Sequence, residues 1–193
     1  FRDLSCIEEK MEIKAKNNEV FEFRPLESSD DHLLGRFFED LSQETRSKFG
    51  PHPLSLEYAI EVICPQIGTD NVSRFVIGSD EKIVGYFIID FNFYQNEKTR
   101  YDSYQVSLDF SNDPVFAPCI ADSYQSLGVA SQALKELIKE LTNRGVRSLV
   151  LMGGTQEPNH LARSFYKKFG FQEQGEFFTD YNGLNNIDMR LML

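Results

Sequence analysis

The segment Gln125–Ala130 has the composition of a turn that binds an anion. It reads Gln-Ser-Leu-Gly-Val-Ala and joins a predicted strand to a strongly amphipathic predicted helix. The first N–H groups of a helix lack intrahelical partners and lie at the positive end of its dipole, so a phosphate there accepts several bonds at once. Gly128 has no Cβ to obstruct that approach. The pattern is neither Walker A nor the dinucleotide fingerprint, and a Ser126 side chain that caps the helix is the alternative interpretation.

A second segment with chemical potential follows between residues 159 and 171. Asn159 is predicted to cap a helix that Gly170 ends, although a cap uses only one side-chain oxygen and leaves the amide free for a ligand. The apolar stripe of this helix comprises Leu161, Ala162, Phe165, Tyr166 and Phe169. From spacing alone, packing within the stripe is the simpler interpretation of Tyr166.

Taken together, the two segments resemble the GNAT superfamily of N-acetyltransferases. The residues that match its Q/R-x-x-G-x-G/A pattern are Gln125, Gly128 and Ala130. Those that match its N-x-x-A-x-x-x-Y-x-x-x-G-F stretch are Asn159, Ala162, Tyr166, Gly170 and Phe171. The resemblance covers residues 20–193 and implies an acetyl-coenzyme A site, with acetyl-CoA as cosubstrate and no metal.

The resemblance also assigns roles by position. It implies that backbone amides of Leu127–Ser131 hold the pyrophosphate, and that Cys119–Ala121 pair with the pantetheine arm and offer an N–H to the acetyl carbonyl. Tyr166 would protonate the departing thiolate. The full set of implied coenzyme-binding residues is Cys119, Ile120, Ala121, Gln125, Ser126, Leu127, Gly128, Val129, Ala130, Ser131, Asn159 and Ala162.

The sequence departs from the family pattern at two points. Many relatives carry Arg at the position of Gln125, so one positive charge near the phosphates is absent; Arg163 and Lys167 are candidate replacements. A primary amine with a pKa of about 10 must lose a proton before it attacks, yet residues 115–121 contain no Glu to act as the base. The candidate bases are His52, Asp90 and Asp122, together with a chain of water molecules.

The acceptor amine is not identified by the sequence. The family fold implies a groove lined by the first two predicted helices, the Gly50–Pro53 connection and the last hairpin. His52, Tyr181 and residues 92–104 are the candidate specificity determinants. A small amine, a peptide N-terminus and a protein lysine all remain open. The alternative function is a regulatory domain that binds CoA without transferring an acetyl group.

The hydrophobic periodicity predicts an α/β fold with a mixed sheet, in the order β-α-α-β-β-β-α-β-α-β-β. Strands are expected at residues 20–26, 73–77, 83–91, 115–121, 146–152, 176–181 and 187–193. Helices are expected over residues 33–41, 55–64, 130–141 and 159–169. Residues 92–113 are interpreted as a long excursion with one irregular strand. Residues 1–19 form an arm or an extra edge strand, and 20–193 a single GNAT-like domain.

Composition limits the classes of function. The net charge of −10 disfavours nucleic-acid binding through a broad basic face. The three cysteines lie far apart, which argues against a disulfide framework or a zinc site and favours the reducing cytoplasm. No apolar run approaches a membrane span, so no membrane partner is expected. A monomer or a homodimer is expected.

Overall fold

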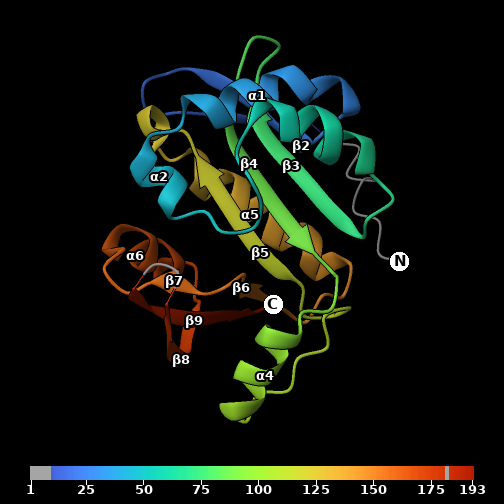
Figure 1. The fold of residues 1–193 in the computed structure, drawn as a ribbon. Helices are drawn as coiled ribbons and strands as arrows, with labels where there is room; N and C mark the ends of the chain where they lie inside the picture. The colour runs from blue at the N-terminus through green and yellow to red at the C-terminus, as the bar shows by residue number, and fades with distance from the viewer. Residues whose placement is uncertain (1–9, 181–182) are drawn as a thin grey trace. The chain divides into compact units, whose positions relative to one another are not determined.

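A computed structural model describes residues 10–180 and 183–193. Its contacts divide the chain into two compact units. Unit 1 comprises the described residues up to Asp90 together with Ala117–Glu140, and unit 2 comprises Phe91–Phe116 and Leu141–Leu193. The described strands form one mixed sheet in the order β1-β2-β3-β4-β5-β6-β9-β7, with β8 paired to β9. The predicted α/β fold with a mixed sheet is therefore confirmed (Figure 1), while the single domain over residues 20–193 stays a prediction.

Unit 1 contains the first four strands and most of β5 and α5. Its strands are β1 (Met11–Lys14), β2 (Val20–Pro25), β3 (Val72–Gly78), β4 (Ile83–Asp90) and β5 (Val115–Ile120). Its helices are α1 (Asp31–Asp40), α2 (Gln43–Ser47), α3 (Leu56–Tyr58) and α5 (Val129–Asn143). The segment before residue 20, for which an arm or an edge strand was open, contains β1, which pairs antiparallel with β2.

The two faces of the β3–β4 hairpin differ in chemistry because side chains alternate along a strand. On one face Phe75 lies opposite Phe87, and Phe23 of β2 contacts both rings at 5.5 and 5.8 Å between centroids. On the other face Val76 lies opposite Tyr86, and Tyr86 packs against Phe38 of α1 at 5.5 Å. The first face is aromatic and apolar at these positions, whereas the second carries the polar groups of Tyr86 and Arg74.

The helical segment over residues 56–66 is less regular than the helix predicted over residues 55–64. It begins as α3, continues as a π-helical turn over Ala59–Ile63 and ends as a 3₁₀ turn over Cys64–Gln66. Pro65 lacks an N–H, and its ring crowds the carbonyl four residues earlier, so regular α-helical bonding cannot extend through it.

Unit 2 contains α4 (Gln95–Ser103), β6 (Ser148–Leu151), β7 (Thr155–Gln156), α6 (His160–Lys168), β8 (Gln172–Thr179) and β9 (Leu184–Met192). The first two residues of β5 pair parallel with β6, and β9 pairs antiparallel with β6, β7 and β8. Tyr181, a candidate specificity residue, lies outside the described residues.

The irregular strand expected within residues 92–113 is wrong: this range contains helix α4 and no described strand. Two charged pairs one turn apart support the helix, Lys98 with Asp102 and Arg100 with Glu97, each at 2.5 Å. Tyr101 anchors it with a side chain that is 0% exposed and donates a hydrogen bond to Met189 O at 3.3 Å.

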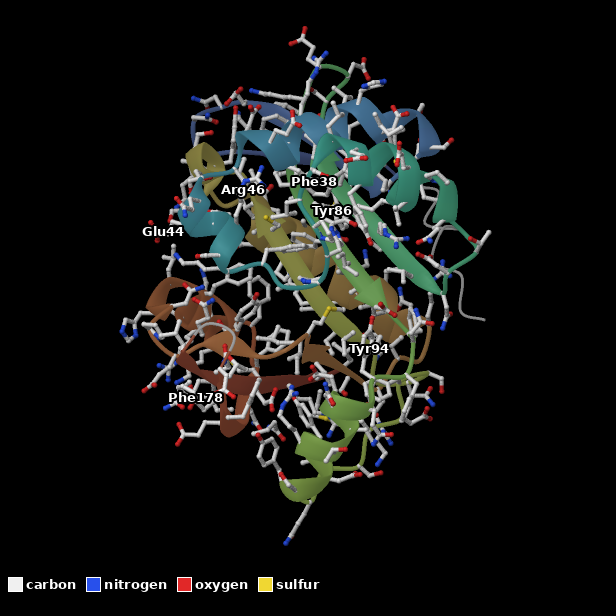
Figure 2. All side chains as sticks on the ribbon, viewed as in Figure 1. Phe38, Glu44, Arg46, Tyr86, Tyr94 and Phe178 are labelled. Atoms are coloured by element: carbon white, nitrogen blue, oxygen red, sulfur yellow. The ribbon has the colours of Figure 1, made fainter. Side chains whose placement is uncertain are left out.

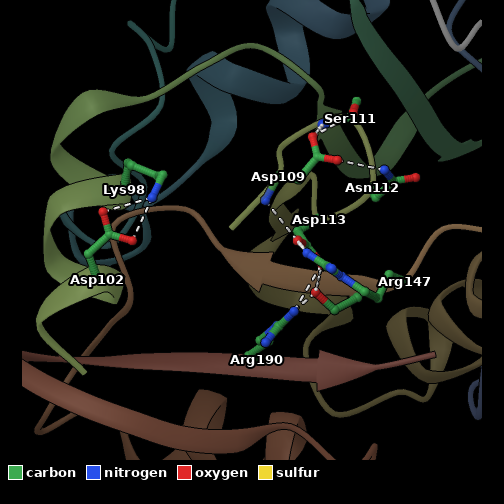
Figure 3. A network of polar contacts seen from close by, with 9 residues as sticks. Lys98, Asp102, Asp109, Ser111, Asn112, Asp113, Arg147 and Arg190 are labelled. Atoms are coloured by element: carbon green, nitrogen blue, oxygen red, sulfur yellow. Dashed lines mark hydrogen bonds and ion pairs between the residues drawn. The ribbon is translucent and has the colours of Figure 1, made fainter. Parts of the chain in front are cut away.

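A buried carboxylate connects the strands of unit 2 (Figure 3). Asp113, whose side chain is 0% exposed, precedes β5. It accepts hydrogen bonds from Arg147 Nε at 2.9 Å, Ser148 Oγ at 2.6 Å and Arg190 Nη2 at 3.0 Å. Burial alone raises the pKa of Asp113, but these donors, Arg147 foremost, hold it at about 2. The carboxylate thus remains charged inside the unit.

Candidate active site

The predicted anion-binding turn connects β5 to α5 within unit 1. A 3₁₀ turn over Asp122–Tyr124 leads into it, and α5 begins at Val129. Ser126 and Gly128 have positive φ angles of 63° and 83°. A Cβ added at Gly128 would find its nearest neighbours at 3.9 Å, so the backbone conformation rather than lack of space demands glycine here.

The amides at the start of α5 are the predicted pyrophosphate ligands. Leu127 N–H donates to Tyr124 O at 3.4 Å and is therefore engaged within the turn. The amides that follow, Gly128 to Ser131, stand at a helix N-terminus, where no carbonyl one turn earlier is available to them inside the helix. Amides in this position can bind an anion, and their assignment to the pyrophosphate stays a prediction.

Lys16 contacts this turn from a distant part of the sequence and was not among the predicted site residues. Its backbone N–H donates to Leu127 O at 3.0 Å, and its ammonium donates to Ser126 O at 3.1 Å. Two residues earlier, Lys14 and the Gln132 side chain exchange hydrogen bonds of 3.3 and 2.9 Å. The chain after β1 is thereby fastened to the turn. Nothing in the local sequence around Lys16 indicates this long-range contact.

The Gln125 side chain ties the turn to α2. Its Nε2 donates to Thr45 Oγ1 at 3.1 Å and to Ile120 O at 3.3 Å. Asp122 accepts from Ser42 Oγ at 2.6 Å and Thr45 Oγ1 at 2.7 Å. Burial alone raises the pKa of Asp122, but the hydrogen bonds from Ser42 and Thr45 lower it overall. Asp122 is thus committed to positioning α2, which removes it as a proton acceptor.

The end of β5 offers one backbone donor on the edge that faces away from β4. Ala121 N–H donates to Val84 O of β4 at 2.9 Å, so this amide is engaged. Because N–H groups alternate between strand edges, Pro118 and Ile120 belong to the opposite edge. Proline has no N–H, which leaves the Ile120 N–H as the backbone donor on that edge.

Burial raises the pKa of the Cys119 thiol to about 12, so it is a structural thiol and no nucleophile.

The second predicted segment forms α6 in unit 2. Asn159 caps this helix, with its Oδ1 accepting a hydrogen bond from Ala162 N at 3.3 Å. Tyr166 is 8% exposed and packs between Phe165 and Phe171, at 5.5 and 5.3 Å between ring centroids. The helix cap and the aromatic packing predicted from spacing are both present.

The two candidate replacements for a family arginine also lie on α6. Arg163 and Lys167 each contact Glu173 at 2.9 Å. Both cations are therefore paired within unit 2, and their common partner lowers their value as phosphate ligands. Glu173 in turn has a lowered pKa because Lys167 and Arg163 donate hydrogen bonds to it.

An aromatic cluster surrounds His52, in the connection between α2 and α3 in unit 1. The imidazole lies 5.1 Å from the ring centroid of Phe49, 5.4 Å from Tyr58, 5.5 Å from Phe38 and 5.7 Å from Tyr86. The Tyr58 ring stacks on the imidazole, whereas the others meet it at steep angles. We call these rings the His52 cluster.

The tautomer of His52 follows from its backbone contact. Nδ1 lies 2.8 Å from Pro53 O, and because a carbonyl only accepts, Nδ1 carries the hydrogen. Nε2 therefore presents a lone pair, which is buried and meets no hydrogen-bond donor among the residues that the structure describes. Burial lowers the pKa of His52 from 6.5 to about 4, so the ring is neutral near neutral pH. A base this weak is poorly matched to the removal of a proton from an ammonium.

Two other buried polar groups lie in the same layer of unit 1. Tyr86 is 0% exposed, and its hydroxyl lies against the Arg74 guanidinium, with which it forms a side-chain hydrogen bond of poor geometry. Arg74 donates from Nη1 and Nη2 to Asp70 at 3.1 and 2.5 Å, while its buried Nε has no hydrogen bond of ordinary geometry among the described residues. An unsatisfied buried group typically costs about 1–3 kcal/mol.

Of the candidate bases, Asp90 is buried at the end of β4, at 5% exposure. His52 is too weak a base and Asp122 is engaged, so the general base stays unassigned.

Among the described residues, no three His, Cys, Asp or Glu side chains gather as a metal site requires. No helix in the described ranges has the length and apolar character needed to cross a membrane.

Comparison with known families gives one match. The model of the acetyltransferase (GNAT) family matches residues 35–171, which include both the turn before α5 and all of α6. No curated protein matches the chain.

Several solved structures share the fold at low sequence identity. The GNAT domain of S. lividans PAT superposes with a TM-score of 0.72 at 15% identity, over 95% of this chain and 97% of that one. The ribosomal-protein-S5-alanine acetyltransferase of Vibrio fischeri gives 0.69 at 14% identity, over 94% and 96%. The spermidine/spermine N-acetyltransferase SpeG of Vibrio cholerae gives 0.62 at 19% identity, over 92% and 95%.

Proposed function

Because this chain belongs to the acetyltransferase (GNAT) family, we propose that it moves an acetyl group from acetyl-CoA to a primary amine by direct attack. The observation that carries the proposal is the turn Gln125–Ala130, where Gly128 at φ 83° opens a helix N-terminus within the region of the family match. The acceptor amine is the proposed partner. A cytoplasmic location and a monomer or homodimer stay predictions.

The residues proposed to bind the donor are those that the family motif implies. The amides of Gly128–Ser131 bind the pyrophosphate, and the free edge at Ile120 pairs with the pantetheine arm. Asn159 and Ala162 on α6 contribute to the coenzyme site, as the family motif implies. Lys16, held against Ser126 O at 3.1 Å, supplies the positive charge that Gln125 does not. Phosphate groups are stabilised by such cations as well as by helix dipoles.

The reaction proceeds through a tetrahedral intermediate in this proposal. The neutral amine attacks the acetyl carbonyl carbon, and the C–N bond forms while the carbonyl oxygen gains negative charge. Ile120 N–H stabilises that oxyanion without reorganisation. The C–S bond then breaks and Tyr166 gives its proton to the CoA thiolate. The surplus amine proton passes to solvent, and solvent returns a proton to the Tyr166 phenolate. The products are the acetylated amine and free CoA.

A second candidate function is a domain that binds CoA and transfers nothing. It is favoured by the weak basicity of His52, with a pKa of about 4, and by the engagement of Asp122, since these leave no assigned general base. The same turn would then bind CoA for ligand sensing alone, and the family match is compatible with that function as well.

Calorimetric titration with acetyl-CoA, followed by thiol release with an amine panel, separates the two. Saturable binding together with thiol release that depends on an amine supports the transferase, and Tyr166→Phe should then lower kcat far more than the KM for acetyl-CoA. Binding without turnover on any amine supports the sensing domain. Gly128→Glu, which places a carboxylate and a Cβ at φ 83°, should abolish binding; intact binding in this variant would contradict the proposed site.

A further inference from the structure

The side-chain amide of Gln125 has one possible orientation. Its terminal group lies 3.3 Å from Ile120 O, and because a carbonyl only accepts, the atom at this position must be the nitrogen Nε2. Nε2 also donates to Thr45 Oγ1 at 3.1 Å. An amide nitrogen carries two hydrogens, so both are used within unit 1. The Gln125 side chain therefore has no N–H left to donate to a phosphate oxygen of the coenzyme.

The hydrogen bonds beyond Gln125 also have a fixed direction. Thr45 Oγ1 lies 2.7 Å from a carboxylate oxygen of Asp122, which only accepts, so the hydroxyl hydrogen points to Asp122 and an oxygen lone pair receives Gln125. Ser42 donates to the same carboxylate from its backbone N–H at 2.9 Å and from its hydroxyl at 2.6 Å. Donors and acceptors match at every step. We call Gln125, Thr45, Asp122 and Ser42 the Gln125 network.

The network also holds the end of β5. In a strand the N–H and C=O of one residue point to the same edge, so Ile120 O lies beside the N–H that is proposed to stabilise the oxyanion. Gln125 engages this oxygen, while Ala121 N–H donates to Val84 O at 2.9 Å on the other edge. A peptide unit is planar, so the unit between Ile120 and Ala121 is held from both sides.

Helix α2 depends on polar contacts for its place in unit 1. It has five residues, none of them buried, and a helix this short is not stable by itself. The Gln125 network holds it on one side. Its Arg46 holds it on the other, by donating to Leu41 O at 3.2 Å, to Leu54 O at 2.7 Å and also to Phe38 O. Figure 2 shows Arg46 directed toward Phe38, whereas Glu44 points away from unit 1.

We propose that Gln125 is a positioning residue of the transferase, which joins the oxyanion donor at the end of β5 to α2 and does not bind the phosphates. The inference rests on the proposed function. Gln125 touches no reacting atom and acts through Ile120, whose N–H must keep its direction as the acetyl oxygen gains charge. Through Thr45 the same side chain fixes α2, which leads into the Gly50–Pro53 connection of the expected acceptor groove.

Lys16 frees position 125 from a charged role. Its ammonium donates to Ser126 O at 3.1 Å, and its Cε lies 3.9 Å from the point where a Cβ of residue 128 would lie. A cation thus stands at the turn although residue 125 is neutral. The neutral amide of Gln125 suits its own place, because its two hydrogens match two uncharged acceptors.

Removing the amide without changing the length of the side chain tests the proposal. Gln125→Met should lower the single-turnover rate of acetyl transfer at least about tenfold, because a displaced donor stabilises the oxyanion poorly. The Kd for acetyl-CoA should stay within about twofold. Spermidine, alaninamide and Nα-acetyl-lysine serve as amine probes. Gln43→Met makes the same change at an exposed position of α2 and should alter neither quantity. A weaker Kd with an unchanged rate would make Gln125 a phosphate ligand and overturn the inference.

Thr45 supplies a second variant and its rescue. Thr45→Val removes the hydroxyl at nearly constant shape and should lower the transfer rate about fivefold, the equivalent of one hydrogen bond. Thr45→Ser keeps the hydroxyl and should retain most of the rate. In the double variant with Gln125→Met the losses should be less than additive, because both changes interrupt one network. Additive losses, or equal rates for Thr45→Val and Thr45→Ser, would contradict the inference.

Hydrogen exchange separates the network from the reaction. In the ligand-free protein, Gln125→Met should speed exchange of the Ala121 and Thr45 amides at least about fivefold, whereas Gln43→Met should not. Faster exchange in a protein that releases thiol with none of the three amines would refute the transferase and leave the network a structural feature only. Unchanged exchange, in a protein that acetylates an amine, would refute the positioning role alone.

Discussion

At the scale of single residues, two buried tyrosines have opposite hydrogen-bond status. Tyr86 and Tyr101 are each 0% exposed. The Tyr101 hydroxyl donates to Met189 O at 3.3 Å, whereas the Tyr86 hydroxyl makes no hydrogen bond of ordinary geometry in the described part of the chain and meets only the Arg74 guanidinium. Burial raises the pKa of both phenols, so both remain protonated at neutral pH. The same chemical change should therefore affect stability in opposite directions.

Tyr101→Phe should lower the free energy of unfolding by about 1 kcal/mol, the net value of a typical hydrogen bond. Tyr86→Phe should leave it unchanged or raise it by up to about 1 kcal/mol, because an unsatisfied hydroxyl no longer has to be desolvated. Urea denaturation of the ligand-free variants measures both values. A loss for Tyr86→Phe as large as for Tyr101→Phe would show that its hydroxyl is satisfied within the free protein.

At the scale of elements, the chain after β1 completes the turn before α5. Lys16→Gln should weaken acetyl-CoA binding about 3- to 10-fold and flatten its salt dependence, because one cation near the phosphates is lost. Lys10→Gln is the matched control, since Lys10 pairs with Glu22 at 3.3 Å on the same strand pair. Calorimetric titrations at two salt concentrations provide the measurement. Equal effects of both variants would mean that Lys16 acts only through general surface charge.

Elements with strong hydrophobic periodicity are predictable from the sequence, whereas elements that depend on tertiary contacts are not. Helix α5 has an uninterrupted apolar stripe, and the predicted residues 130–141 lie within the observed Val129–Asn143. In contrast, α4 buries Glu97 beside Tyr101, so its buried face mixes a charge with an aromatic ring and no apolar stripe marks it. The two residues of β7 are too few for any period to show.

The candidate site was predictable to the same degree. Gly128 and the Asn159 cap follow from local backbone requirements, which sequence motifs record. The contact of Lys16 with Ser126 O spans 110 residues, and the ties of Gln125 to Thr45 span 80, so only the folded chain reveals them. The contact of Arg74 with Tyr86 also depends on strand register, which fixes the face on which each side chain lies.

At the scale of the whole molecule, acid should act on the two units in separate pH windows. His52 in unit 1 has its pKa lowered by burial from 6.5 to about 4, so the unfolded chain binds a proton first as the pH falls. The stability that neutral His52 contributes is complete above pH 6.5 and is lost as the pH falls toward about 4. The loss is on the order of 3 kcal/mol for full burial.

Asp113 in unit 2 has a lower pKa than His52 in unit 1. Its pKa falls from 3.8 to about 2, so its contribution is complete above pH 3.8 and is lost only as the pH falls toward 2. Unit 1 should therefore weaken first, between about pH 6.5 and 4, while the Asp113 network persists. Hydrogen exchange at stepped pH should show amides of β3 and β4 losing protection before those of β6 and β9.

The two variants that remove the titrating groups should separate the windows. His52→Phe removes the imidazole and should reduce the pH dependence of stability between about pH 6.5 and 4, because the proton that the unfolded chain gains at His52 is no longer available. Asp113→Asn leaves two arginines facing a neutral amide and should cost about 3 kcal/mol at pH 7, with the loss below pH 3.8 reduced. If β6 and β9 lost protection first in the unmodified protein, the buried carboxylate rather than the imidazole would set the acid limit.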